Sequence, residues 1–233
     1  MSTQRLSDSD LRDFYRQDYV DSYKSKDTGS HPSRITRLIP LCRLKPTDVV
    51  VDLACGNGML LKELHDQVAG YHGVDFSSEF IEAARSRARQ LNAGNAVFHE
   101  ADIVEFCGDH PDEFDVAFTL DFSEHVYDED FVRIATSIRS SLKPDGRLFV
   151  HTPNATYFLE ILKARGILRQ FPSHIAVRNA RENVALLQAA GFRDIKVSYL
   201  SHYLPPLSWL HPLRHLPLAG RFFQARLFIE CTA

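Results

Sequence analysis

Short apolar runs alternate with helix-like segments through most of the chain, and this alternation limits its possible folds more than any other feature. The run VVVDLA at 49–54 is apolar and largely β-branched, a pattern typical of a strand buried on both faces. The segments between such runs carry apolar residues at helical spacing, such as Phe80, Ile81 and Ala84 after the potential cap Ser77. The alternation predicts βαβ units in a parallel sheet with helices on both faces. The further predicted strands are 71–76, 96–102, 114–121 and 147–152.

The last third of the chain departs from this alternation. Asn179 and Glu182 have the spacing of a capping box, and Gly191 follows where the helix they would begin should end. Two strands then remain, at 195–201 and in the closing RFFQARLFIECTA, with no helix between them. They predict an antiparallel pair at one edge. The expected fold is therefore a doubly wound (Rossmann-like) α/β fold, with a mostly parallel seven-stranded sheet and an antiparallel edge strand.

The first 45 residues predict a helical cap in front of this sheet. Residues 8–24 and 33–44 carry apolar side chains near helical spacing, and Pro46 follows the second segment. We therefore expect a helical cap over 1–45 and the main domain over 46–233.

Composition excludes several classes of protein. The 27 Lys and Arg against 30 Asp and Glu give a net charge of −3, which disfavours nucleic acid as a partner. The chain has neither an apolar run long enough to span a membrane nor the apolar core of a secretion signal, so a cytoplasmic location is expected. The four cysteines form no CxxC pair and are expected to be free thiols.

A glycine loop and three aspartates predict a ligand site at the carboxyl ends of the strands. Gly56 and Gly58 follow the first strand and allow a close approach of backbone to ligand. Asp52, Asp75 and Asp102 lie in or directly after three successive strands. One such aspartate alone is more often a helix cap, but three in this order favour a nucleoside ligand. Leu61 occupies the third position of the dinucleotide fingerprint, which disfavours a nicotinamide-dependent oxidoreductase.

The motifs VVVDLACGNG, GVDFS, EADI and LKPDGRLFVHTPN resemble those of the class I S-adenosylmethionine-dependent methyltransferases over roughly residues 30–200. The resemblance implies S-adenosylmethionine as cofactor and a methyltransferase domain over 46–233. It implies that Asp75 holds the ribose and that Arg34 pairs with the cofactor carboxylate. Ala54 stands where glycine is more usual. The other residues that it implies in the cofactor site are Asp52, Ala54, Gly56 and Gly58 in the first motif, Phe76, Asp102 and Ile103 around the adenine, and Leu120 near the sulfonium.

A cluster of candidate catalytic residues follows the fourth strand. Asp121, Glu124 and His125 converge if this stretch forms a helical turn. The ubiquinone-biosynthesis O-methyltransferases are similar here, with an E-x-x-E-H run and an asparagine after strand five. This implies a metal site, with Mg²⁺ as the candidate ion, formed by Asp121, Glu124, His125 and Asn154, although Asp121 shortens the first ligand. The alternatives are a base or substrate contact without metal, with Glu124, His125 and His174 as the candidate catalytic residues, and a structural role.

Residues 203–223 form an apolar insert with four prolines, the single tryptophan and no acidic residue. This insert, centred on about 203–220, predicts a lid over an apolar substrate, a surface that contacts a membrane, or an ordinary packed insertion. The leading function is methyl transfer to oxygen of a small molecule, for which an apolar or lipid-derived acceptor is one candidate. The alternatives are N- or C-methylation of a small molecule and a catalytically inactive cofactor-binding regulator.

Overall fold

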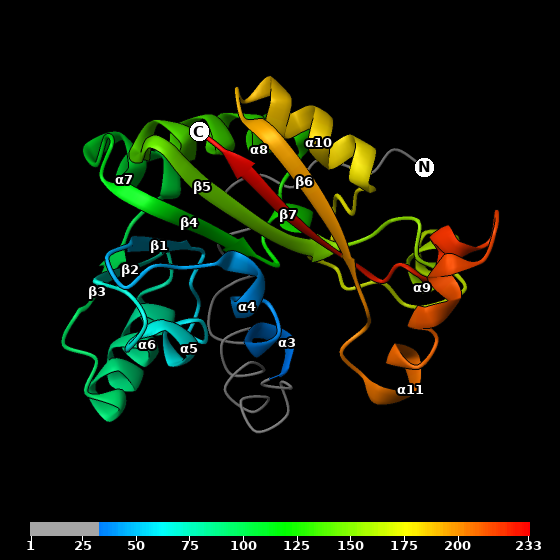
Figure 1. Cartoon of the computed structure of the whole chain (residues 1–233), viewed down its shortest axis with the longest axis horizontal. Helices are drawn as coiled ribbons and strands as arrows, with labels where there is room; N and C mark the ends of the chain where they lie inside the picture. Colours follow the sequence, from blue (N-terminus) through cyan, green and yellow to red (C-terminus); the bar gives the residue numbers. More distant parts are fainter. Residues whose placement is uncertain (1–32) are drawn as a thin grey trace.

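A computed structural model describes residues 33–233, and its centre is one seven-stranded sheet (Figure 1). The strand order is β3-β2-β1-β4-β5-β7-β6, and β7 runs antiparallel to both of its neighbours, whereas all other pairs in the order are parallel. The expected fold class and the antiparallel pair of late strands are thus confirmed, with β7 between β5 and the edge strand β6. The strands are β1 Val49–Leu53, β2 Gly70–Asp75, β3 Ala96–Glu100, β4 Phe114–Leu120, β5 Leu142–Pro153, β6 Arg193–Leu200 and β7 Arg226–Thr232.

Helices cover both faces of this sheet (Figure 1). The side chains of β1 alternate between the two faces, as a strand requires: Val51 packs in one core and Val50 in the other. The first core includes Phe106 and Phe131 from α7 and α8, and the second includes Leu61 and Ile81 from α5 and α6. The α-helices are α3 Ser33–Thr36, α4 Ile39–Cys42, α5 Leu61–Leu64, α6 Ser78–Leu91, α7 Ile103–Asp109, α8 Asp128–Ser141, α9 Phe158–Ala164, α10 Ala180–Ala189 and α11 Pro205–Ser208; the 3-10 helices are η1 Ser123–His125, η2 His211–His215 and η3 Gly220–Phe223.

The local sequence signals for helix ends are confirmed. The Ser77 hydroxyl accepts a hydrogen bond from the backbone N–H of Phe80 at 3.3 Å and caps α6. Asn179 and Glu182 form the reciprocal bonds of a capping box at the start of α10. Gly191 follows α10 with a φ of +90°, a left-handed conformation that glycine adopts without steric cost.

Two local expectations differ from the structure. The helix expected over 33–44 is divided into α3 and α4. The strand expected at 147–152 is part of a longer strand, β5, which begins at Leu142; in its first part Asp145 has a φ of +63° and the pairing with β4 is irregular. The helix expected over 8–24, and with it most of the expected cap, lies outside the described residues.

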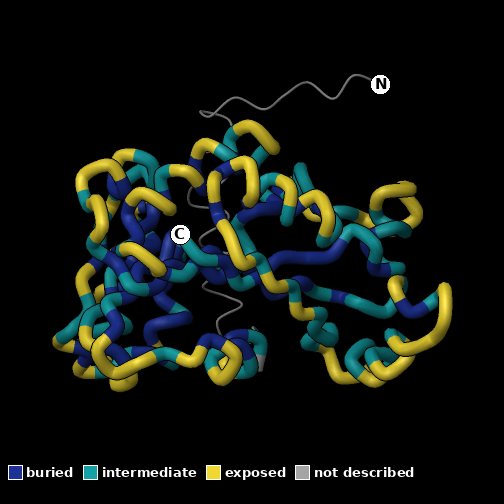
Figure 2. The backbone as a smooth tube through the Cα atoms, turned by 45° about the horizontal axis from the view of Figure 1, so that its top comes forward, coloured by how far each residue is buried: buried dark blue, intermediate teal, exposed yellow. Residues whose placement is uncertain are grey.

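Burial follows the sheet, and Figure 2 shows the exposed backbone mainly in the helices and loops around it. All four cysteines are free and buried, as expected. No helix within residues 33–233 has the length and apolar character needed to cross a membrane.

Candidate functional site

The loop after β1 is held in left-handed backbone conformations. Ala54, Gly56 and Gly58 have φ values of +58°, +52° and +74°. A Cβ added at Gly56 would have no atom within 4 Å, so this position faces open space, as a ligand cradle requires. A Cβ at Gly58 would lie 3.2 Å from Cβ of Ala84 in α6, so helix packing accounts for this glycine. Ala54 carries the steric cost of the left-handed region, about 1–2 kcal/mol.

Asp75 connects the glycine loop to the end of β2. Its carboxylate accepts hydrogen bonds from the backbone N–H groups of Gly56 at 2.9 Å and Ser77 at 3.0 Å. Burial raises the pKa of Asp75, and hydrogen bonds from the backbone of Ser77, Gly56 and Phe76 oppose this rise. The ring of Phe76, next in the chain, is 43 % exposed at the same edge of the sheet. The structure therefore brings together the glycine loop, Asp75 and an exposed aromatic ring.

Asp52 and Asp102 make hydrogen bonds of their own within the protein. The buried Asp52 accepts a hydrogen bond from the Tyr71 hydroxyl at 2.6 Å, and burial raises its pKa to about 7. The Asp102 side chain caps α7 by accepting from the backbone N–H of Val104 at 2.8 Å. Its neighbour Ile103, the first residue of α7, and Leu120, the last residue of β4, are partly buried against the two cores.

The Asp121 carboxylate is enclosed by three basic groups. Its oxygens lie 2.7 Å from Nη1 of Arg34, 3.0 Å from Nη1 of Arg226 and 2.9 Å from Nδ1 of His151. Burial alone would raise the pKa of Asp121, but these neighbours, Arg34 first, hold it well below its usual range. A carboxylate engaged in this way is not available as a metal ligand.

Asn154 is likewise engaged by the protein. Its buried amide accepts from the Thr156 backbone at 3.2 Å and hydroxyl at 3.0 Å, and donates to the Gln224 carbonyl at 2.8 Å. The metal set expected from the sequence, Asp121, Glu124, His125 and Asn154, is therefore not the set that the structure assembles.

Glu124, His125 and His174 form a different cluster, in which one ligand atom from each lies within 4.8 Å of the others. The His125 and His174 rings meet edge to face, with centroids 5.0 Å apart. The sequence predicted each as a candidate catalytic residue, and the structure brings all three together across almost 50 residues of chain. A carboxylate and two imidazoles suit a Zn²⁺-type ion better than Mg²⁺, which prefers oxygen ligands.

Burial keeps this cluster in its uncharged forms at neutral pH. It raises the pKa of Glu124 to about 8, with the charge of Asp121 as the second cause. It lowers the pKa of His125, and it lowers that of His174 to about 4. Nδ1 of His125 lies 2.9 Å from the Ser173 carbonyl oxygen, which can only accept, so Nδ1 carries the proton and Nε2 has the lone pair.

Arg178 fixes this cluster in place and was not predicted from the sequence. Its buried guanidinium donates to the carbonyl groups of Ser123 and Val126, both at 2.7 Å, and to Asp128 at 2.7 Å. It thereby ties η1, which carries Glu124 and His125, to the segment before α10. A single arginine before a helix cap has no pattern that would reveal this role.

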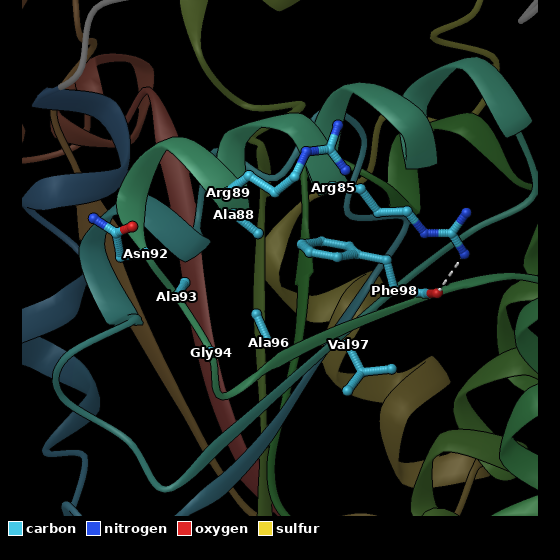
Figure 3. Close-up of a pocket in the computed structure, with 9 residues that line it drawn as sticks. All are labelled: Arg85, Ala88, Arg89, Asn92, Ala93, Gly94, Ala96, Val97 and Phe98. Atoms are coloured by element: carbon cyan, nitrogen blue, oxygen red, sulfur yellow. Dashed lines mark hydrogen bonds between the residues drawn. The ribbon is translucent and has the colours of Figure 1, made fainter.

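An open depression of about 690 Å³ lies elsewhere, between the end of α6 and the start of β3 (Figure 3). Arg85 crosses it and donates to the Phe98 carbonyl at 2.9 Å. Because Ala96 begins β3, the depression extends to the amino end of this parallel sheet, opposite the glycine loop. It contains none of the residues predicted for the site.

Comparison with known families gives one matching model, described as a methyltransferase domain, over residues 44–197. This range contains the glycine loop, Asp75, Asp121 and the Glu124–His125–His174 cluster.

Two relatives are ubiquinone biosynthesis O-methyltransferases. The one from Actinobacillus pleuropneumoniae serotype 5b is 33 % identical over 130 residues, which are 53 % of this chain and 54 % of that protein. The one from Brucella ovis is 34 % identical over 125 residues, 52 % of this chain and 49 % of that protein. The chain thus aligns with about half the length of these curated relatives.

Solved structures share the fold at low sequence identity. A SAM-dependent methyltransferase from Archaeoglobus fulgidus has a TM-score of 0.68 at 20 % identity, covering 92 % of this chain and all of that chain. Haemonchus contortus phosphoethanolamine N-methyltransferase 2, in complex with S-adenosyl-L-methionine, has a TM-score of 0.67 at 17 % identity and covers 100 % of this chain and 61 % of that chain. At these identities the likeness concerns the fold alone.

Proposed function

Because the chain belongs to the class I S-adenosylmethionine-dependent methyltransferases, we propose that it methylates a hydroxyl oxygen of a small molecule, with a phenol as the acceptor. The observation that carries this proposal is the His125 imidazole, which burial keeps neutral and which lies in one cluster with Glu124 and His174. A phenol must lose its proton when it is methylated, and a positioned imidazole can accept that proton. The printed names of the relatives, which are O-methyltransferases, also support oxygen as the methylated atom.

The residues around the glycine loop fit the cofactor. Open space at Gly56 admits a ligand against the backbone, and Asp75 lies at the adjoining strand end, where it would hold the ribose hydroxyls. Arg34 would take the cofactor carboxylate, and its pairing with Asp121 places it at the end of β4. The exposed Phe76 ring would stack on the adenine. The remaining assigned contacts are Asp102 and Ile103 at the adenine, Ala54 in the loop backbone and Leu120 near the sulfonium.

In this reaction the protein has two tasks: it positions the acceptor oxygen next to the methyl group, and it removes the proton of the acceptor hydroxyl. When bound, S-adenosylmethionine supplies a methyl group that is already activated as part of a sulfonium. The acceptor oxygen forms the new O–CH₃ bond while the S–CH₃ bond breaks, and S-adenosylhomocysteine leaves. His125 Nε2 takes the hydroxyl proton, and the Ser173 carbonyl holds the ring in the required tautomer.

Mg²⁺ has no place in this proposal. Two of the four residues implied by the resemblance, Asp121 and Asn154, are bound by arginines and by loop atoms, and the cluster that does form contains two imidazoles. No step of the proposed reaction passes through a metal.

Replacing His125 by alanine should lower methyl transfer to catechols by about 100-fold, the lower range for loss of a general base. The measurement is S-adenosylhomocysteine formation with catechol and 3,4-dihydroxybenzoate as probe acceptors. Affinity for S-adenosylhomocysteine should be unchanged, because His125 lies outside the glycine loop. His65→Ala, next to α5 and outside the cluster, is the matched control. Unchanged turnover in His125→Ala, or an equal loss of cofactor affinity, would contradict the assigned role.

An exposed apolar surface adjoins this site and supports a membrane-associated acceptor. In the insert, Trp209 is 76 % and Leu218 96 % exposed, and in the segment after α9, Ile167 is 65 % and Phe171 58 % exposed. The rings of Phe158 in α9 and Phe223 in η3 lie 6.1 Å apart, so the two segments are in contact. We define these four exposed residues as the apolar rim.

Charge favours an anionic lipid surface as the partner of this rim. Residues 161–181 and 201–229 contain no aspartate or glutamate, although the whole chain has a net charge of −3. The exposed cations Arg165 and Arg169 lie in the first segment. Apolar side chains beside arginines are the composition that lies in the interface of an anionic bilayer. Contact there would place the His174 segment next to a lipid-derived acceptor.

Vesicles with anionic phospholipid should shift the emission of Trp209 to shorter wavelength, and zwitterionic vesicles should do so much less. Trp209 is the only tryptophan in the chain, so its signal is unambiguous. Leu218→Asp should weaken vesicle binding by about tenfold or more, since it removes a large apolar side chain and adds a negative charge. Aspartate tolerates the φ of +61° at this position, so the fold is preserved. Val97→Asp, at a half-exposed position of β3, is the control.

A blue shift that depends on protein concentration without vesicles would instead identify the partner as a second copy of the chain. Equal binding to both kinds of vesicle, or unchanged binding by Leu218→Asp, would also contradict a docking surface for anionic lipid.

A further inference from the structure

Three arginines gather around a single ionised carboxylate at the carboxyl ends of β4 and β6. Arg34 and Arg226 both pair with Asp121. Arg37, which lies between α3 and α4, interacts electrostatically with all three of these residues. Glu124, also nearby, adds little negative charge at neutral pH because burial raises its pKa to about 8. The described residues therefore leave an excess of positive charge in a partly buried place.

Arg37 is the member of this group that uses only part of its hydrogen-bonding capacity within the described residues. Its Nη1 donates to the Ser201 hydroxyl, just after β6, at 3.1 Å. Its Nε and Nη2 are buried, and neither makes a hydrogen bond with another of the described residues. A guanidinium presents five donors in a fixed fork that matches the oxygens of a carboxylate or phosphate. Two buried donors on one such fork are therefore suited to a bound oxyanion.

The positive charges around Arg37 affect the pKa values of nearby residues. Burial lowers the pKa of His202 to about 4, and the charges of Arg226 and Arg37 are among the further causes. The pKa of Arg37 itself is lowered, by burial first and then by Arg226, and Asp121 opposes this. Burying the charged guanidinium of Arg37 beside two other arginines has an energetic cost in the ligand-free protein. A bound anion would offset this cost.

We propose that Arg37, with Arg226 beside it, binds an anionic group of the methyl acceptor, a carboxylate or a phosphate. This inference rests on the proposed function, because it assigns a substrate class to the same site. Arg34 is directed to Asp121 and to the cofactor end, whereas Arg37 contacts the β6 end through Ser201, on the side of the insert. Together with the apolar rim, this assignment describes an amphiphilic acceptor, with an anionic group at Arg37 and an apolar part toward the rim.

The test uses two simple anions on the full chain. The protein is saturated with S-adenosylhomocysteine, so that the cofactor carboxylate site is filled, and inorganic phosphate and benzoate are titrated separately by calorimetry. The wild type should bind at least one of them, and which one distinguishes a phosphate from a carboxylate. Arg37→Gln should weaken this binding by about tenfold or more, the usual effect of losing a charged hydrogen-bond donor. Arg169→Gln, the same change at an exposed arginine, should leave it unchanged.

A second readout separates binding from a structural role. Without ligand, Arg37→Gln should unfold at the same temperature as the wild type or higher, because it removes a buried, incompletely paired cation. Arg37→Lys retains the charge but loses the fork, and it should bind the anion more weakly than the wild type.

Several results would overturn the proposal. These are the absence of anion binding by the wild type, equal anion affinity in Arg37→Gln, and a marked loss of stability in that variant. A loss of S-adenosylhomocysteine affinity in Arg37→Gln would assign Arg37 to the cofactor and overturn it too. If the wild type fails to bind S-adenosylhomocysteine, the proposed function itself fails, and anion titrations of the unsaturated protein still decide the role of Arg37.

Discussion

Replacing Asp121 by asparagine should lower the free energy of unfolding by about 3 kcal/mol or more, the usual result of removing one partner from a buried ion pair. Asp121 is the carboxylate that Arg34, Arg226 and His151 share. Without its charge, the arginines around it repel one another in a place with little water. Asparagine adopts the φ of +55° at this position readily, so the variant tests the charge and not the backbone.

The matched control is Asp145→Asn. Asp145 also has a positive φ, of +63°, and also pairs with an arginine, Arg193, at 3.2 Å. Its side chain is 85 % exposed, however, against 15 % for Asp121. An exposed pair contributes about 0–1 kcal/mol, so this variant should unfold almost as the wild type does in urea. Equal effects of the two substitutions would show that Asp121 is screened by solvent and does not hold the arginines together.

The pH dependence of stability gives a second test of the charge on Asp121. Its folded-state pKa lies well below the ordinary value, so its contribution is present above the unfolded-state pKa of about 4 and is lost as pH falls through the folded-state pKa. The difference between the wild type and Asp121→Asn should therefore shrink in strong acid, as the Asp121 carboxylate of the wild type takes up a proton.

The sheet could be predicted because its signals are local. Continuous apolar runs such as VVVDLA identify buried strands, and Ser77, Asn179 and Gly191 mark helix ends through their own hydrogen bonds or backbone freedom. The division of residues 33–44 into α3 and α4 also has a local signal, which the helical spacing of the apolar residues concealed. Pro40 lies in the first turn of α4, and proline has no backbone N–H to continue a helix from the preceding turn.

The site was predictable where a motif combines residue type with position on a strand. Asp75, at the end of β2, contacts Gly56 in the loop that follows the neighbouring strand β1. Glu124 and His125 lie in the same 3-10 turn, η1. The partners of Asp121 could not be predicted, because Arg34, His151 and Arg226 come from three distant segments that only the fold brings together. For the same reason the expected metal set differs from the cluster in the structure, because no sequence pattern indicates that the Asp121 carboxylate is paired with basic side chains.

Glu124→Gln should become more stable relative to the wild type as pH rises from about 4.5 to about 8. Burial raises the pKa of Glu124 to about 8 in the folded protein, whereas an unfolded glutamate ionises near its ordinary value. Between these two values the folded state holds a proton that the unfolded state has lost, so each pH unit favours unfolding by about 1.4 kcal/mol. Between the unfolded-state and folded-state pKa values, Glu124 lowers the free energy of unfolding of the wild type by several kcal/mol in total. Glutamine resembles the protonated acid and does not titrate.

The measurement is urea unfolding of both proteins at pH 5, 6, 7 and 8. The variant should match the wild type most closely at pH 5 and exceed it increasingly toward pH 8. Burial also raises the pKa of Asp52 to about 7. Its ionisation lowers the stability of both proteins to the same extent as pH rises, so this effect cancels from the difference between the two curves. Glu105→Gln, an exposed glutamate in α7, should give a curve parallel to that of the wild type.

Parallel curves for the wild type and Glu124→Gln would mean that Glu124 is ionised in the folded protein at neutral pH. The cluster would then carry a second carboxylate charge beside Asp121, and the excess of positive charge around Arg37 would be smaller. Curves that diverge toward pH 8 would support a protonated, uncharged Glu124 in the folded protein at neutral pH. Among residues 33–233, a neutral Glu124 beside neutral His125 leaves Asp121 as the ionised acid next to the arginines, so a base for the acceptor hydroxyl and a cation for its anionic group can coexist in one site.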